Sequence, residues 1–377
     1  VKIPEIKMNE SKKNRLIAEA RTLRALYYFN LVRFFGDVPL ILDLKTVEDS
    51  KGPRDSKELI YDQIIEDLTF AEEHLPLRSE YSASDEGRIN KGAAKILFGK
   101  VYLTKGDFQK AKDKLAEVVE HESEYGFGLH KDYHANWLRD TEAGIEAVLY
   151  IEYKEPPFQH NGEMALAGPK YSIPGSLGIS ALNEADIPTQ ELYDQFDNRD
   201  LRKKTNFKTE FAHLKTGEIL KSSIPLSGKF WVEGLETGDR CDVNMHIIRY
   251  ADAILMYAEA LNEVGESTKA LAMLNRIRER AFGDDSGNFK PMSKDEFRTA
   301  ILNERRLEFP HEGHRWFDLV RTGTFIQRMK EHSAYEAKVA EANKTEIAQN
   351  IKEHMILMPI PQSEIDLNPN LVQNAGY

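Results

Sequence analysis

The chain has 377 residues, of which 41% are hydrophobic, so it can bury a large core with more than one layer of packing. Its 51 Lys and Arg residues stand against 62 Asp and Glu residues, and the resulting formal charge of −11 argues against nucleic acid as a partner. The single cysteine, Cys241, excludes a disulfide within the chain and a CxxC metal site, and no apolar run is long enough to span a bilayer.

Residues 11–35 are predicted to form the first long helix. Apolar residues recur there at steps of three and four, and we expect the resulting stripe to be the buried face: Leu16, Ala20, Leu23, Tyr27, Leu31 and Phe34. Gly36 should end this helix. A second amphipathic helix is predicted over residues 56–75, with a core face made by Leu59, Ile60, Ile64, Leu68 and Ala71.

Two later segments, residues 90–121 and 247–281, are each predicted to form a pair of helices around a glycine turn. In the first, Ala111 and Leu115 follow Gly106 by five and nine residues, and in the second Ala270 and Leu274 keep the same offsets from Gly265. A small residue at the alanine position lets the two helices of a pair approach closely. Both segments resemble tetratricopeptide repeats, which stack helix–turn–helix units on one another.

The segment between these pairs, residues 125–242, has a different character. It holds many of the glycines and prolines and two of the three tryptophans. We expect a strand at residues 146–153, a short helix at 189–197 and one or two short strands within 207–230. An irregular insert on a rigid helical scaffold is where function is expected.

Near the C-terminus, Ser293 and Glu296 have capping-box spacing and predict the start of a helix that Pro310 and Gly313 interrupt near Phe309. A short second helix should carry Trp316, with Asp318 and Arg321 spaced for an ion pair, so the bland interpretation is a buried turn fixed by ion pairs. The alternative is a metal site at His311, Glu312 and His314, although this spacing is not the H-E-x-x-H pattern.

Three separated motifs carry a resemblance to one family. They are E-R-R-L-E with E-G-H-R-W-F-D-L-V-R (from residue 304), the helix ending in F-F-G-D-V-P-L (to residue 40), and I-P-Q-S-E-I-D-L-N-P-N-L-V-Q-N-A-G-Y (from residue 360). The chain resembles the SusD/RagB family of nutrient-binding outer-membrane lipoproteins. Pro310 and His311 depart from the small or apolar residues that the family pattern leads us to expect there.

The predicted fold class is therefore all-α: one SusD-like domain over residues 1–377, built of tetratricopeptide-like helical hairpins, with a loop-rich insert containing minor β structure. The resemblance implies a surface-exposed lipoprotein of the outer membrane that binds a glycan and delivers it to a SusC-like TonB-dependent transporter. It also implies that the export signal and the lipid-bearing cysteine lie upstream, so that this chain is shortened at its N-terminus. Its last segment is expected to close the chain against the helical body.

No motif for chemistry stands out. The chain has no G-x-x-x-x-G-K-[ST] loop, no G-x-G-x-x-G after a strand and no G-x-S-x-G elbow, and we predict no catalytic residue, no cofactor and no metal. Glu152 and Glu155, on either side of Tyr153, are the nearest candidates for a glycosidase-like carboxylate pair.

A sugar ring needs a flat aromatic side chain against its apolar face and planar polar groups around its hydroxyls. The insert offers both kinds, and we predict a ligand-binding set made of Trp231, Tyr171, Trp137, Phe158, Tyr153, Asn161, Asp239 and Arg240. Trp231 and Tyr171 are the strongest candidates, because their neighbours are turn-forming residues. The alternatives are a helical-repeat scaffold that binds only protein, a hydrolase, and a binder of another nutrient such as peptide.

Overall fold

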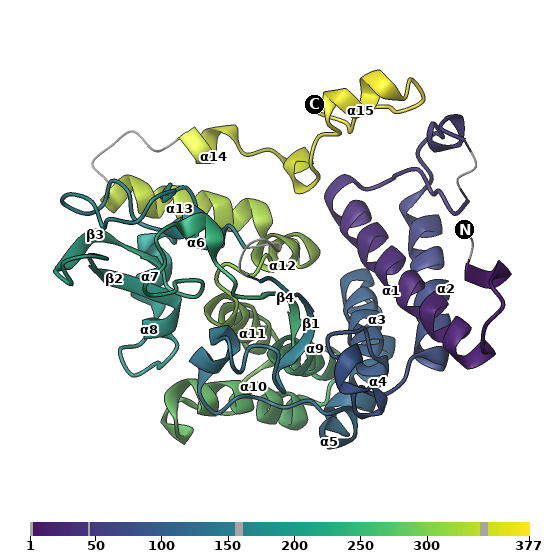
Figure 1. The fold of residues 1–377 in the computed structure, drawn as a ribbon, viewed down its shortest axis with the longest axis horizontal. Coiled ribbons are helices and arrows are strands. Elements are labelled where there is room, and N and C mark those ends of the chain that lie inside the picture. Colours follow the sequence, from purple (N-terminus) through teal and green to yellow (C-terminus); the bar gives the residue numbers. More distant parts are fainter. Residues whose placement is uncertain (1–2, 44–45, 155–160, 340–345) are drawn as a thin grey trace. The chain divides into compact units, whose positions relative to one another are not determined.

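The computed structural model describes residues 3–43, 46–154, 161–339 and 346–377, and most of these residues are helical (Figure 1). The chain forms two compact units. The first consists of Val1–Ser84, Arg88–Lys105 and Trp316–Tyr377, and the second of Asp85–Gly87 and Gly106–Arg315. None of the helices in the described ranges combines the length and the apolar character that a membrane span requires.

The first unit is built on α1 (Glu10–Phe35), α2 (Lys57–His74) and α3 (Lys91–Lys105), with α2 packed against both of the others. Each of the first two helices starts at a side-chain cap, because Asn9 accepts the N–H of Lys12 and Ser56 accepts the N–H of Leu59. Helix α13 (Phe325–Val339) and several short elements complete the unit: η1 (Ile3–Glu5), η2 (Glu48–Ser50), η3 (Arg78–Glu80), α14 (Glu346–Asn350), η8 (Glu353–Ile356) and α15 (Gln362–Leu367).

The predicted buried face of α1 is wrong. The helix buries a neighbouring face made by Ala18, Thr22, Ala25, Leu26, Phe29 and Val32, whereas Leu23, Tyr27 and Leu31 are exposed. Helix α1 carries apolar residues on two faces, and periodicity alone does not choose between them. The buried face includes the two alanines, which let α2 approach closely. In α2 the prediction holds for Ile60, Ile64, Leu68 and Ala71, and Leu59 is exposed.

The C-terminal segment packs on the end of α1, as the resemblance implied. The N–H of Met358 donates to the Phe34 carbonyl at 2.7 Å, and Asn374 Nδ2 donates to the Phe35 carbonyl at 3.1 Å. Gly36 ends α1 with a φ of 72°, and a Cβ there would lie 3.1 Å from Leu357, so both the backbone angle and the close tail favour glycine. The final segment therefore closes the first unit.

The second unit is organised around α9 (Tyr250–Glu263), which is buried from Tyr250 to Asn262. Helices α4 (Phe108–Val119), α10 (Ser267–Phe282) and α11 (Lys294–Glu308) pack against it, and α9 and α10 form a hairpin at Gly265. The residues singled out by their matching offsets, Ala111, Leu115, Ala270 and Leu274, are all fully buried.

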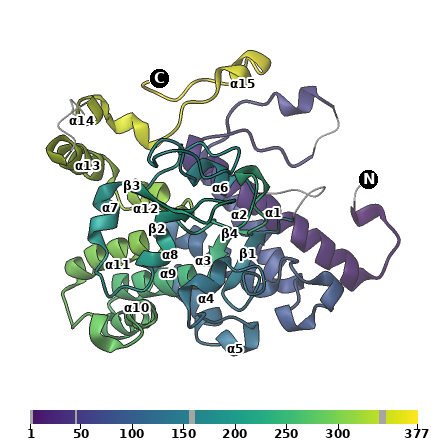
Figure 2. The ribbon, with the colours of Figure 1, turned by 60° about the vertical axis from the view of Figure 1, so that its left-hand side comes forward.

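The insert adds two small antiparallel sheets to the second unit (Figure 2). Strand β1 (Ala147–Ile151), predicted from its alternation, pairs with β4 (Met245–Arg249), and β2 (Phe207–Ala212) pairs with β3 (Ile219–Ser227). The remaining short helices are α5 (Glu122–Tyr125), α6 (Glu163–Ala167), α7 (Gln190–Gln195), α8 (Lys203–Asn206), η5 (Tyr133–Trp137), η6 (Gly238–Arg240) and η7 (Asp285–Gly287). Two short segments, η4 (Ala83–Asp85) and α12 (Arg315–Arg321), straddle the limits of the two units.

Candidate functional site

The motif that begins at residue 304 forms the end of α11 and the turn after it. Ser293 and Glu296 make the predicted capping box, and α11 ends at Glu308 with Phe309 as its cap. Beyond it, His311 and Gly313 have positive φ values of 59° and 72°, so the chain turns sharply and the side chains of Glu308 and Glu312 are buried in the second unit. The predicted Asp318–Arg321 ion pair is also present, at 2.9 Å.

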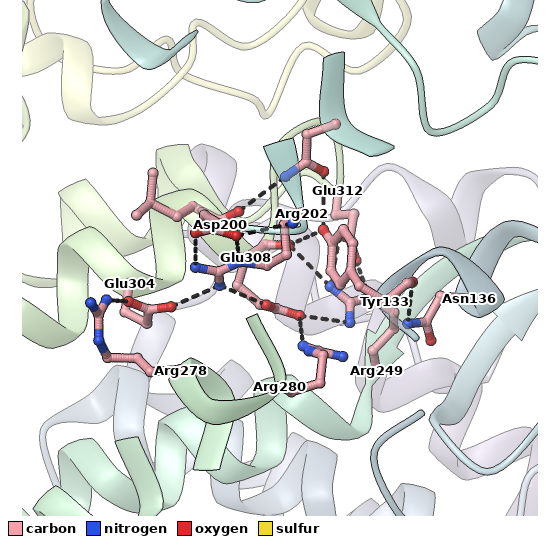
Figure 3. Close-up of polar contacts among 12 residues, drawn as sticks. Tyr133, Asn136, Asp200, Arg202, Arg249, Arg278, Arg280, Glu304, Glu308 and Glu312 are labelled. Carbon is pink, nitrogen blue, oxygen red and sulfur yellow. Dashed lines mark hydrogen bonds and ion pairs between the residues drawn. The ribbon is translucent and has the colours of Figure 1, made fainter. Parts of the chain in front are cut away.

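Glu308 lies at the centre of a buried ion network (Figure 3). Its carboxylate pairs with Arg280 at 2.5 Å, Arg202 at 2.9 Å and Arg249 at 3.0 Å. Within the described ranges, the ion pairs of this network connect five cations with five carboxylates, so the charges balance: Arg202, Lys229, Arg249, Arg278 and Arg280 with Glu146, Asp200, Glu304, Glu308 and Glu312.

The network stays ionised because its members face one another. Burial alone would raise the pKa of Glu308, but the guanidiniums of Arg280, Arg249 and Arg202 lower it to about 2. Burial lowers the pKa of Lys229 to about 8, against the opposing charge of Glu312 at 2.5 Å. Removing one member would unbalance the charges of the network and leave an uncompensated charge in the interior, which is strongly destabilising.

The network fastens the insert to the helices of the second unit. Glu146, Asp200, Arg202 and Lys229 come from the insert, and they pair with residues of β4, α10, α11 and the turn after it. Tyr133, also from the insert, donates its hydroxyl to the Glu308 carbonyl at 2.6 Å. The family motif therefore holds the irregular insert in place, and its role is structural.

His311, Glu312 and His314, the residues of the alternative metal site, each contact a different set of residues. Glu312 binds Arg249 and Lys229, whereas His311 Nδ1 lies 3.1 Å from Asp186. His314 Nδ1 lies 3.9 Å from Asp252. Within the described ranges, no three His, Cys, Asp or Glu side chains are grouped so that they could hold a metal ion.

Tyr171 stands on a loop of the insert that a carboxylate holds in shape. Its side chain is 76% exposed. Glu184 Oε2 accepts the backbone N–H groups of Lys170, Tyr171 and Ser172 at 2.6, 2.7 and 3.0 Å. Burial opposes the ionisation of Glu184, but these donors outweigh it and lower its pKa. The loop thus presents an aromatic ring to solvent on a fixed backbone.

Backbone strain accompanies this loop. Glu184 and Ala181 adopt positive φ values of 53° and 60°, which are uncommon for residues other than glycine. Such conformations persist where the surrounding structure enforces them, and they are frequent at binding sites. Sequence reasoning missed Glu184, because no spacing rule links a carboxylate to amides twelve to fourteen residues away.

Trp231 is half-buried between two hydrophobic clusters of the insert, one containing Met164 and Phe230 and the other Phe211 and Leu226. Its ring meets Phe211 edge-on, with a centroid distance of 4.8 Å. Its indole Nε1 is buried and donates no hydrogen bond to any residue in the described part of the chain. One part of the Trp231 side chain therefore packs against the two clusters, and another part remains accessible to solvent.

Other predicted ligand residues lie apart from solvent. Trp137 is only 4% exposed and packs on Tyr133, so the structure gives it a packing role instead of the predicted ligand-facing one. Asn161 is 2% exposed, and its amide group donates to the Val243 carbonyl and accepts the N–H of Glu163, so both ends of the amide are engaged inside the insert.

The rest of the predicted set is less constrained. Tyr153 is half-buried, and its backbone N–H donates to Asn244 Oδ1 at 2.8 Å. Arg240 is exposed at the end of η6, which also contains Asp239. Phe158 lies outside the described residues, as does Glu155 of the carboxylate pair considered for hydrolysis.

The carboxyl group of Glu142, in the insert, has a raised pKa. Burial raises the pKa of Glu142 to about 7. Its Oε2 accepts the N–H of Asn244 at 2.9 Å, and its backbone carbonyl contacts His246 Nε2 at 3.0 Å. These contacts join β4 to the segment before β1, so Glu142 acts in the packing of the insert.

Comparisons with known proteins agree with this architecture. The model of the SusD family matches residues 225–377, and one described as starch-binding and associating with outer membrane matches residues 2–103. A SusD-like protein of Formosa agariphila is 31% identical over 408 residues, which cover 98% of this chain and 75% of that protein. The starch-binding protein SusD of Bacteroides thetaiotaomicron is 24% identical over 437 residues, covering 98% of this chain and 74% of its own length.

Solved structures match over the whole chain. A laminarin-binding SusD-like protein has a TM-score of 0.78 and 28% identity, and the match covers 100% of this chain and 82% of that one. A SusD superfamily protein of Parabacteroides distasonis has a TM-score of 0.82 and 28% identity, with 100% and 81% covered. The predicted tetratricopeptide-like, all-α fold class is confirmed, and the chain belongs to the SusD/RagB family.

Proposed function

We propose that this protein binds an oligosaccharide or polysaccharide at the cell surface without altering it. It would deliver the glycan to a SusC-like TonB-dependent transporter in the outer membrane. Support comes from the 28% identity and TM-score of 0.78 to a laminarin-binding SusD-like protein, and from the starch-binding protein SusD among its relatives. The match to a starch-binding, outer-membrane-associated family model supports the location.

The observation that carries the proposal is the exposed ring of Tyr171 on the loop held by Glu184. A sugar ring presents an apolar C–H face, and a fixed aromatic side chain can cover that face without first losing conformational freedom. Because the loop is already ordered by three hydrogen bonds, less binding energy is spent on shaping it. One stacked ring gives modest affinity, so Trp231, Tyr153 and Arg240 are proposed as further contacts.

Attachment and delivery are the finer parts of the proposal. A lipid anchor of the kind that the family resemblance implies would hold the protein to the outer membrane. The transporter is proposed from family membership.

The test is a titration of the whole chain with soluble oligosaccharides, comparing Tyr171→Ala with Tyr171→Phe. Tyr27→Ala is the matched control, because Tyr27 is another strongly exposed tyrosine, 64% exposed, and lies in the other unit. The proposal expects Tyr171→Ala alone to weaken binding. Binding of peptides in place of glycans would favour another nutrient, and binding of proteins only would favour the helical-repeat scaffold. Release of reducing ends from the same glycans would identify a hydrolase.

A further inference from the structure

The second unit contains a pocket that none of the predicted ligand residues lines. Its volume is about 450 Å³, within the range of small-ligand sites. It lies where α7, α8 and β2 meet, and these elements stay together in both views of the ribbon (Figures 1 and 2). The wall residues include three lysines, two aromatics and two acids: Lys203, Lys204, Lys208, Tyr193, Phe207, Asp200 and Glu210.

Both acidic residues of the pocket have a cationic partner. Asp200 is 3% exposed and pairs with Arg202 at 2.7 Å, as a member of the buried ion network (Figure 3). Glu210 pairs across the β2–β3 sheet with Lys221 at 3.1 Å. Lys208 is likewise paired, with Glu233, so the cations without a carboxylate partner in the pocket are Lys203 and Lys204, on a chain whose net charge is −11.

Lys203 is a positioned cation whose charge is not cancelled. Its ammonium lies 4.3 Å from the centre of the Tyr193 ring and donates to two neutral oxygens, the Phe196 carbonyl and Asn198 Oδ1. An ammonium has three N–H donors, so one remains for a ligand. Among the described residues, no carboxylate lies within ion-pair distance of Lys203 or Lys204.

Lys208 also lines the pocket, but its ammonium contacts residues outside it. Its Nζ lies 2.8 Å from the carboxylate of Glu233 and 5.5 and 5.8 Å from the ring centres of Phe211 and Trp231, none of which lines the pocket. The apolar side of the pocket is made by Leu201, Phe207 and the Tyr193 ring, whose edge-to-face contact with Phe207 has a centroid distance of 5.1 Å. Cations around an apolar wall suit a ligand with an anionic group on a ring with a C–H face.

We propose that this pocket binds an acidic saccharide, with Lys203 and Lys204 around its anionic group and Tyr193 beside its ring. The inference deepens the proposed glycan-binding function and rests on it. A uronic-acid carboxylate and a sulfate ester share the required chemistry. Both are anions on a sugar ring, and both accept hydrogen bonds from ammonium groups.

The experiment is a calorimetric titration of the whole chain with a neutral glucan oligosaccharide, an oligogalacturonide and a sulfated galactan oligosaccharide of similar length. One of the acidic ligands is expected to bind on the order of tenfold more tightly than the neutral one, with an advantage that shrinks as salt screens the charges. The oligogalacturonide tests recognition of a carboxylate, and the sulfated galactan tests recognition of a sulfate ester.

The variants are Lys203→Gln with Lys204→Gln, and Lys204→Gln alone in case the pair disturbs α8. The matched control is Lys131→Gln with Lys290→Gln, two exposed lysines of the same unit outside the pocket that change the net charge equally. The pocket variants should lose the advantage of the acidic ligand and keep the affinity for the neutral one, while the control keeps both.

The outcomes separate the two proposals. If neutral oligosaccharides bind and acidic ones bind no more tightly, the pocket inference is overturned and the glycan function stands. The same holds if the control pair lowers the acidic advantage as much as the pocket pair. If no saccharide of any kind binds, both proposals are overturned.

Discussion

The Glu184 carboxylate accepts the backbone N–H of Tyr171 at 2.7 Å, and this contact orders a loop on which Tyr171 is 76% exposed. The same oxygen also accepts the N–H groups of the residues on either side. A flexible surface loop would present its ring in many orientations, whereas this one has a carboxylate at its base that fixes the backbone. Glu184 thus fixes the backbone of Tyr171, the residue that we propose contacts the ligand.

Glu184→Ala is predicted to weaken glycan binding several-fold, nearly as much as Tyr171→Ala, because the loop loses its three acceptor contacts and must be ordered by the ligand. Glu184→Gln should have a smaller effect, since its amide oxygen still accepts hydrogen bonds. Calorimetry of both variants with the best oligosaccharide tests this. Unchanged affinity in Glu184→Ala would show that the loop needs no such support.

Glu308→Gln is predicted to destabilise the protein by about 3–5 kcal/mol, because three guanidiniums are left without their shared carboxylate in the interior. The measurement is urea unfolding followed by circular dichroism. Glu233→Gln is the control, since its pair with Lys208 is solvent-exposed and should change stability by less than about 1 kcal/mol. Equal effects of the two substitutions would contradict a special role for the buried network.

Acid should unfold the protein through the same network. The ordinary pKa of a glutamic acid side chain is 4.5, and that of Glu308 in the fold is about 2. The unfolded chain therefore binds a proton first as the pH falls, so the stability from Glu308 is full above pH 4.5 and is lost as the pH falls toward 2. The free energy of unfolding, measured from pH 6 to pH 3 at constant salt, should fall steeply below about pH 4.5. A flat profile there would disagree with ionised, paired carboxylates.

Glu142→Gln is predicted to stabilise the protein at alkaline pH. The pKa of Glu142 is raised from 4.5 to about 7 in the folded protein. Its contribution to the free energy of unfolding is therefore fully present below pH 4.5 and is lost as the pH rises through 7, where the buried carboxyl must ionise. At pH 8 the variant should be more stable than the parent by about 1 kcal/mol, and at pH 4 the two should be equal. Glu152→Gln, at an exposed carboxylate nearby in sequence, is the control. Destabilisation of Glu142→Gln at pH 8 would show that the charged form is needed.

Local signals in the sequence predicted local structure. The spacing of Ser293 and Glu296 located the start of α11, because a capping box needs only residues three apart. The offsets from Gly106 and Gly265 located the buried positions of two helices in the same way. The stripe of α1 failed because its helix has two apolar faces, and only the packing of α2 decides which one is buried.

The candidate site was less predictable, because its geometry depends on residues far apart in the chain. Arg202 and Glu308 are 106 residues apart, and nothing near Arg202 indicates that it meets a carboxylate of α11. Trp137 and Tyr171 were both predicted from the sequence to face a ligand, yet one is 4% exposed and the other 76%. The lysines at 203, 204 and 208 become a pocket only because Tyr193 and Asp200 fold beside them.

The most direct test of the glycan-binding account is the affinity of Tyr171→Ala for a soluble oligosaccharide that binds the parent chain, measured beside Tyr27→Ala. Loss of a stacked ring should lower affinity on the order of tenfold in Tyr171→Ala and leave Tyr27→Ala unchanged. Equal affinity in all three proteins, or the absence of glycan binding by the parent chain, would contradict it.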